Sequence, residues 1–251
     1  MAVVELTHTA ALLRGLAPMT ATSRRWRDAN GTEALARRCD ALASRIRAGI
    51  AAHGVVHRPE LGGDVYAYEV DGFGNALLMD DANVPSLLSL PYLGFVKATD
   101  PVYARTRAYV LSNATNPWFF EGRAGEGIGG PHVGAGAIWP MAIIIRALTS
   151  SNDAEITDAL TTLKASAAIP NSWLIHESFS ASDANRYTRP WFACKHADLF
   201  RTPLAFGHFL SHPHAWVCAH RAGANSLFGE LVMKLSKDRP HLVGIPSSVG
   251  R

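Results

Sequence analysis

The sequence predicts an all-α protein in which helices in series form an α/α toroid. Apolar residues recur at helical spacing along several segments. Between them lie long loops, with only short extended pieces such as 65–70, and no alternation of long strands and helices indicates a doubly wound sheet. An irregular helical bundle would give much the same pattern, so both architectures stay open.

The expected helices follow one another along the chain. The clearest one has the apolar stripe Leu35, Cys39, Leu42, Ile46 and Ile50. Another begins after Asn152, a residue type favoured at the N-cap. The predicted helical ranges are 2–16, 32–53, 85–95, 101–112, 137–150, a helix after 152, and 223–236.

Composition excludes several classes of protein. The chain has 251 residues, 48% hydrophobic and 18% charged, which is ordinary for a globular domain. A net charge of +3 without a long run of Lys or Arg does not indicate a nucleic-acid partner. The longest apolar run, 138–145, contains Pro140 and is too short to span a membrane. Compartment and oligomeric state remain unknown from the sequence.

Three long loops, at 62–83, 113–136 and 170–190, combine aromatic residues with acids, amides and histidines. Aromatic rings can stack on the C–H face of a pyranose while short polar side chains pair with its hydroxyls. The alternative is that the aromatics belong to the core and the acids cap helices.

The acids of the first loop, Asp80 and Asp81, stand with Asn83 just before Pro85. One acid or amide suffices to cap the helix expected there, so a ligand role is predicted for at least one of the three. In the second loop, Glu126 and His132 flank a glycine-rich stretch that lets backbone approach a ligand. It lacks the Gly-Lys-Ser/Thr ending of a phosphate-binding loop, and a turn-rich connection is its plainer interpretation.

The third loop contains His176-Glu177-Ser178. No second histidine follows at the helical spacing of a zinc protease, and no Gly-x-Ser-x-Gly surrounds Ser178. Glu177 among aromatic residues is instead a candidate general base. The three cysteines, of which Cys39 lies on the apolar stripe, form neither a disulfide framework nor a CxxC zinc motif.

These strings together resemble glycoside hydrolase family 125, the exo-acting α-1,6-mannosidases. The matching stretches are YAYEVDGFGNALLMDDANVPSLLSLPYLGF, NPWFFEGRAGEGIGGPH, IWPMAIIIRALTSSNDAEI, IHESF with TRPWFA, and ANSLFGEL. The resemblance implies an (α/α)6 barrel, removal of terminal mannose from an α-mannoside oligosaccharide or glycan with inversion, and neither metal nor organic cofactor. It assigns the general base to Glu177. Residues expected to line the pocket are Asp80, Asp81, Asn83, Glu126, His132, His176 and Arg189.

Two departures from the family pattern shape the expectation. The family's general acid, an Asp in a Ser-Asp-Asp motif, should precede this sequence, so residues 1–251 are expected to form a partial, C-terminal barrel domain. About thirty residues at 194–223, with five histidines, interrupt the match; a retained intron, a real loop or, least favoured, a metal site would explain them. Little or no hydrolysis is expected from the chain alone, and a mannoside-binding remnant or an inactive pseudogene product are the alternatives.

Overall fold

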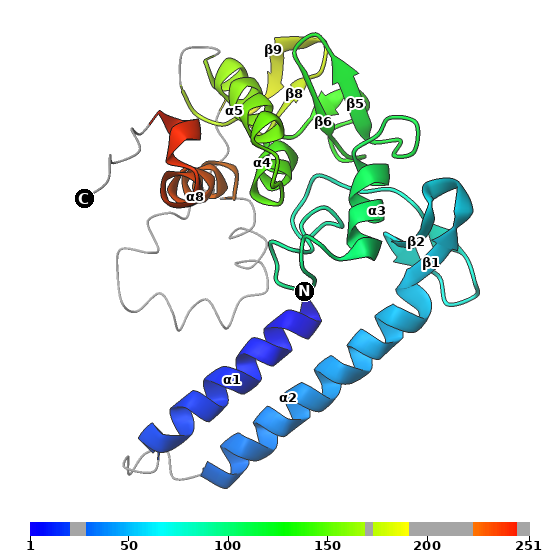
Figure 1. Ribbon diagram of the computed structural model, residues 1–251, viewed down its shortest axis with the longest axis vertical. Helices are drawn as coiled ribbons and strands as arrows, with labels where there is room; N and C mark the ends of the chain where they lie inside the picture. Colours follow the sequence, from blue (N-terminus) through cyan, green and yellow to red (C-terminus); the bar gives the residue numbers. More distant parts are fainter. Residues whose placement is uncertain (21–28, 169–172, 191–222, 245–251) are drawn as a thin grey trace. The chain divides into compact units, whose positions relative to one another are not determined.

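The computed structural model describes residues 1–20, 29–168, 173–190 and 223–244 (Figure 1). The chain divides into two compact units. The first comprises Met1–Leu78 and Leu90–Thr106, and the second Met79–Ser89 and Arg107–Arg251. The predicted interruption at 194–223 lies outside the described residues except for Gly223, which opens a helix.

The first unit is built on a hairpin of two long helices, α1 (Ala2–Thr20) and α2 (Ala29–Gly49), which lie side by side (Figure 1). Val3 near the start of α1 packs with Ala43 near the end of α2, so the helices are antiparallel. Further along, Ala10 packs with Ala36 and Cys39. These small side chains allow the two helix backbones to approach closely.

The predicted apolar stripe of α2 is only partly correct. Cys39 is buried as expected, but Leu35 and Leu42 are each 44% exposed. The helix buries Ala36 and Ala43 instead, one position further along. Hydrophobicity alone therefore misplaced the contact face, because α1 packs where the side chains are smallest.

Short antiparallel hairpins complete the first unit. After the π-helical turn η1 (Ile50–Gly54), β1 (Val55–Arg58) pairs with β2 (Gly63–Tyr66) around the 3-10 turn η2 (Pro59–Leu61). A second hairpin joins β3 (Glu69–Val70) and β4 (Ala76–Leu77). The helix α3 (Pro101–Val110) contributes Thr106, whose hydroxyl accepts the backbone N–H of Tyr66.

The second unit places helices against two small sheets. The hairpin β5 (Phe119–Gly122) and β6 (Gly125–Ile128) is one. The other has the order β7 (Ala137–Ile138), β8 (Ser178–Ser180), β9 (Asp183–Thr188). The helix α4 (Pro140–Leu148) is almost wholly buried, because it contacts both α5 (Asp153–Ala167) and α8 (Gly223–Asp238), which ends near η4 (Pro240–Val243).

The predicted helix at 85–95 is wrong. These residues form turns, since Ser86 and Ser89 exchange side-chain bonds with each other's backbone, and Asp80 accepts the N–H groups of Leu87 and Leu88. Such side-chain bonds compete with the backbone hydrogen bonds of a helix. The other predicted helices form, and Asn152 caps α5 by accepting the N–H groups of Ala154 and Glu155, as expected. The described residues are thus helical with short hairpins.

Candidate active site

The residue that sequence analysis singled out, Glu177, lies immediately before β8. Ser178 is registered with Thr188 of β9, so Glu177 stands opposite Arg189. The Arg189 Nε lies 3.4 Å from Glu177 Oε2. The Glu177 side chain is only 7% exposed, whereas that of Arg189 is 56% exposed. A buried carboxylate is therefore held from one side by a cation that reaches solvent.

His176, beside it, has no exposed surface. Its ring stacks on that of Tyr187, with centroids 4.2 Å apart and planes 3° from parallel. Its Nδ1 lies 2.7 Å from the carbonyl oxygen of Pro190, and since a carbonyl only accepts, this nitrogen carries the proton. From α8, Asn225 accepts the N–H of Ile175 and donates to its carbonyl, which fixes the approach to β8.

The neighbouring strands end at the same edge. Ile138 of β7 is registered with Phe179, which puts Trp139 beside Ser178. The backbone N–H of Trp139 donates to the carbonyl of Ile128, the last residue of β6. The ring of Trp139 meets that of His132 edge to face, with centroids 6.1 Å apart. His132 and the Glu177 segment thus approach the same strand ends.

The segment 80–83 is joined to this edge through β6. The N–H of Ala82 donates to the carbonyl of Gly129. A Cβ on Gly130 would lie 2.8 Å from Asp81 Oδ2, so only glycine leaves Asp81 its position. Asp81 Oδ1 accepts both the backbone and the side-chain N–H of Asn83. Asp81 and Asn83 are therefore in contact, Gly130 lies against Asp81 two residues before His132, and Asn83 and His132 are exposed.

Asp80 has a different environment. It has no exposed surface, and its two oxygens accept the N–H groups of Leu87 and Leu88 at 2.9 Å each. Burial raises its pKa to about 7, although both N–H bonds act in the opposite direction. Tyr109 is buried as well, and its own burial raises its pKa. The negative charge of Asp80 adds to that effect. Asp80 thus occupies the capping role that the sequence left open, here for a turn.

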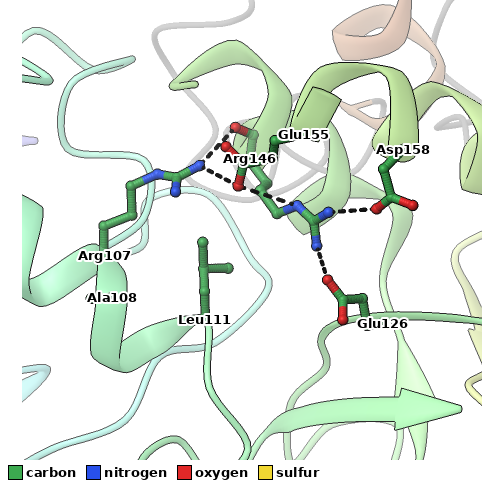
Figure 2. Close-up of a pocket in the computed structure, with 7 residues that line it drawn as sticks. All are labelled: Arg107, Ala108, Leu111, Glu126, Arg146, Glu155 and Asp158. Atoms are coloured by element: carbon green, nitrogen blue, oxygen red, sulfur yellow. Dashed lines mark hydrogen bonds and ion pairs between the residues drawn. The ribbon is translucent and has the colours of Figure 1, made fainter. Parts of the chain in front are cut away.

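Glu126 is engaged elsewhere in the second unit (Figure 2). Its Oε1 accepts a hydrogen bond of 2.7 Å from Arg146, which also donates to Asp158 at 2.6 Å. Glu155 approaches Arg146 at 3.5 Å and binds Arg107 at 2.8 Å. We call these five residues the Arg146 cluster. They line a cavity of about 450 Å³ with Ala108 and Leu111.

Within the described residues, no hydrogen bond or ion pair joins the Arg146 cluster to Glu177. The side-chain contact described for Glu126 is thus with Arg146. Sequence analysis missed Arg146 and Arg107, although one signal was present. Arg146 interrupts an otherwise apolar helix, and a buried arginine needs acidic partners.

The aromatic residues divide between the core and the surface. Phe119 and Phe179 are buried, so for these two the core interpretation was correct. Trp118 and Phe120 meet edge to face across 6.3 Å, and Trp173 is 60% exposed. Tyr66, Tyr68 and Phe73 belong to the first unit, and Trp191 and Phe192 lie outside the described residues.

The described part of the chain offers neither a metal site nor a membrane-spanning helix. Among these residues, no group of three His, Cys, Asp or Glu side chains is placed to hold a metal ion. None of the described helices has the length and apolarity needed to cross a bilayer.

Comparison with known proteins agrees with the resemblance. A family model described as metal-independent α-mannosidase (GH125) matches residues 1–200. The meiotically up-regulated gene 157 protein of Schizosaccharomyces pombe is 43% identical over 97% of this chain, which spans 39% of that protein. A metal-independent α-mannosidase from Streptococcus pneumoniae, solved in a non-productive complex with α-1,6-mannobiose, superposes with a TM-score of 0.67. It is 31% identical, and the match covers 94% of this chain and 47% of that one.

Proposed function

This chain belongs to glycoside hydrolase family 125, the metal-independent α-mannosidases, and from that membership we propose that its Glu177 site serves the inverting hydrolysis of terminal α-1,6-linked mannose. The substrate class is supported by the mannobiose bound in the structural neighbour. The chain spans 39% of its curated relative and 47% of that neighbour, so the activity of the whole protein is part of the proposal.

In the proposed mechanism Glu177 is the general base. Inversion uses two carboxyl groups roughly 6.5–9.5 Å apart, one to activate water and the other to protonate the leaving oxygen. Glu177 takes a proton from water as that water attacks the anomeric carbon. The acid is proposed to lie in the part of the family domain that this chain does not span, and the complete (α/α)6 barrel is proposed on the same ground.

The observation that carries the assignment is the environment of Glu177. Its carboxylate is buried, and Arg189 is its ion-pair partner among the described residues. Most buried carboxylates are fully paired, because an ionised group loses its hydration on burial. A carboxylate held from one side only can still accept a proton from a bound water.

The sugar is proposed to bind beside this base. Asp81 contacts Asn83 and approaches Gly130, and His132 packs on Trp139 near the strand ends. Carboxylate, amide and imidazole groups pair well with hydroxyls. His176 and Arg189, which the resemblance placed in the pocket, flank Glu177. Glu126 is the least supported pocket residue, because Arg146 occupies its carboxylate.

The test measures binding and cleavage of α-1,6-mannobiose by the purified chain. We expect saturable binding with little or no release of mannose, since the chain supplies only the base. Asp81→Asn should weaken binding, whereas Glu126→Gln, a matched change in the Arg146 cluster, should not. Absence of binding by a cooperatively folded chain would refute the proposed site, and robust hydrolysis would refute the proposed division of base and acid.

A second candidate is a non-catalytic mannoside-binding protein, which is favoured by the limited share of its relatives that the chain spans. The two candidates differ in what Glu177 does. Supplying the remaining part of the family domain from a relative should restore mannose release if Glu177 is the base, and Glu177→Gln should abolish that release. Binding unaffected by Glu177→Gln, with no restored release, would favour the binding protein.

A further inference from the structure

We propose that His176 is a positioning residue, which fixes residues 187–190 so that Arg189 stays against Glu177. The inference rests on the proposed role of Glu177 and goes beyond it, because it concerns how the base is held. A group with no exposed surface cannot touch a sugar in this conformation, so His176 acts through its neighbours rather than as part of the pocket wall.

The contacts of His176 bracket Arg189 on both sides. The ring stacks on Tyr187, two residues before Arg189, and donates from Nδ1 to the carbonyl of Pro190, one residue after it. Between these contacts, the hydroxyl of Thr188 lies 2.7 Å from that of Ser178. The end of β9 is therefore attached to the β8 side at residues 187, 188 and 190, on both sides of the arginine.

The backbone of Arg189 explains why such attachment is needed. Its φ is 50°, a left-handed conformation that residues with a Cβ rarely adopt. Conformations of this kind persist when the surrounding contacts determine them, and they cluster at functional sites. Here the left-handed residue ends the strand pairing, and the carbonyl of Pro190 then takes a side-chain donor, His176.

The consequence reaches Glu177 through one contact. Arg189 Nε approaches Glu177 Oε2 at 3.4 Å, near the limit of a hydrogen bond. A small rotation of the arginine backbone would break it and leave a buried carboxylate without its cation. His176 thereby controls the charge environment of the base without touching the reacting atoms.

Two substitutions separate the contacts of His176. His176→Asn keeps an N–H donor close to the position of Nδ1, whereas His176→Phe keeps a ring for Tyr187 and loses the donor. The readout is the Arg189 Nε–H signal in ¹H–¹⁵N spectra, whose exchange with water reports the contact with Glu177. We expect exchange at least about tenfold faster in His176→Phe, and partial protection retained in His176→Asn. Unchanged exchange in a folded His176→Phe protein would overturn the proposal.

A buried histidine can be needed for folding, so a second variant changes the stacking partner of His176 and leaves His176 itself in place. Tyr187 is only partly buried, and Tyr187→Leu removes the stack while His176 stays in place. We expect faster Arg189 Nε–H exchange here as well, with a thermal transition that remains cooperative. Exchange at the wild-type rate would contradict positioning through the 187–190 segment.

Arg189→Gly relieves the left-handed backbone and removes the guanidinium. It should preserve folding while abolishing the signal, which assigns it. Failure of the chain to bind α-1,6-mannobiose would refute the proposed function and leave these exchange measurements intact. Unchanged exchange with normal binding would refute the positioning role alone.

Discussion

Two glutamate–arginine pairs of the second unit have opposite burial. At the end of β8 the carboxylate of Glu177 is buried and Arg189 is 56% exposed. In the Arg146 cluster the guanidinium is buried and Glu126 is 47% exposed. Among the residues that the structure describes, the buried member has one ionic partner in the first pair and three in the second. Similar residue types thus form two different kinds of site.

Under the proposed function, the difference separates a reactive site from one that holds the fold. An arginine with three carboxylates around it has its charge compensated and its donors directed at β6 and α5. A glutamate with one partly exposed partner retains capacity to accept a proton. Active sites commonly keep such groups at some expense in stability, and structural clusters do not.

The largest effect is expected from Arg146→Met. It leaves Glu126, Glu155 and Asp158 without their shared cation, and removing one partner of a buried pair costs about 3–5 kcal/mol. Because two of these carboxylates are about half exposed, we expect the lower end, about 3 kcal/mol, in the free energy of unfolding by urea.

Arg189→Met is the matched control for that change. Its guanidinium is more than half exposed, so solvent screens the pair, and we expect a loss of about 1 kcal/mol although the Glu177 carboxylate is buried. Equal losses for the two methionine variants would show that the two pairs are energetically equivalent, and the comparison would fail.

Asp80 sharpens the comparison, because it is buried like Glu177 but accepts two backbone N–H groups. Its pKa is raised from 3.8 to about 7 by burial, so the folded chain holds a proton that the unfolded chain releases in that interval. Its contribution to stability is therefore present at low pH and lost as the pH rises towards 7. Between about pH 4 and 7 the loss should be about 3 kcal/mol, because each pH unit between the two pKa values corresponds to about 1.4 kcal/mol.

The measurement is urea unfolding at several pH values in wild-type and Asp80→Asn proteins. The variant should show a flatter dependence between about pH 4 and 7. The readout is the slope of the free energy of unfolding against pH. The stability at one pH is unsuitable, because the amide of Asn accepts only one of the two N–H bonds and the loss of the other bond affects the stability at every pH. Parallel curves would show that Asp80 does not titrate in this interval.

The predictable part of the fold is the part that local sequence determines. Helical spacing indicated α2, and Asn152 marked the start of α5, since both signals lie within a few residues of the element. The turn at 85–95 could not be predicted in this way. It depends on Asp80, which precedes the segment in sequence and whose carboxylate accepts the N–H groups of Leu87 and Leu88.

The candidate site shows the same limit. The surplus of acids at 80–83 predicted a ligand residue, but only the structure distinguishes the buried Asp80 from the partly exposed Asp81. Glu126 was placed in the pocket by the family resemblance, and the glycines around it were also compatible with a turn-rich connection. Its partner Arg146 is twenty residues away in sequence, and the contact between them depends on how α4 packs against β6.

The smallest effects are expected when Glu126 and Glu177 are neutralised in turn. Here the sign of the change in the free energy of unfolding distinguishes the two sites. Glu126→Gln replaces the ionic hydrogen bond with Arg146 by a neutral one and should lower the free energy of unfolding by about 1 kcal/mol. Glu177→Gln removes a buried charge and keeps the side-chain shape. Stability should therefore be unchanged or raised by up to about 1 kcal/mol. Both values come from urea unfolding at a common pH. A loss at Glu177 as large as at Glu126 would mean that Arg189 compensates its charge fully, and the argument that Glu177 is held open for chemistry would fall with it.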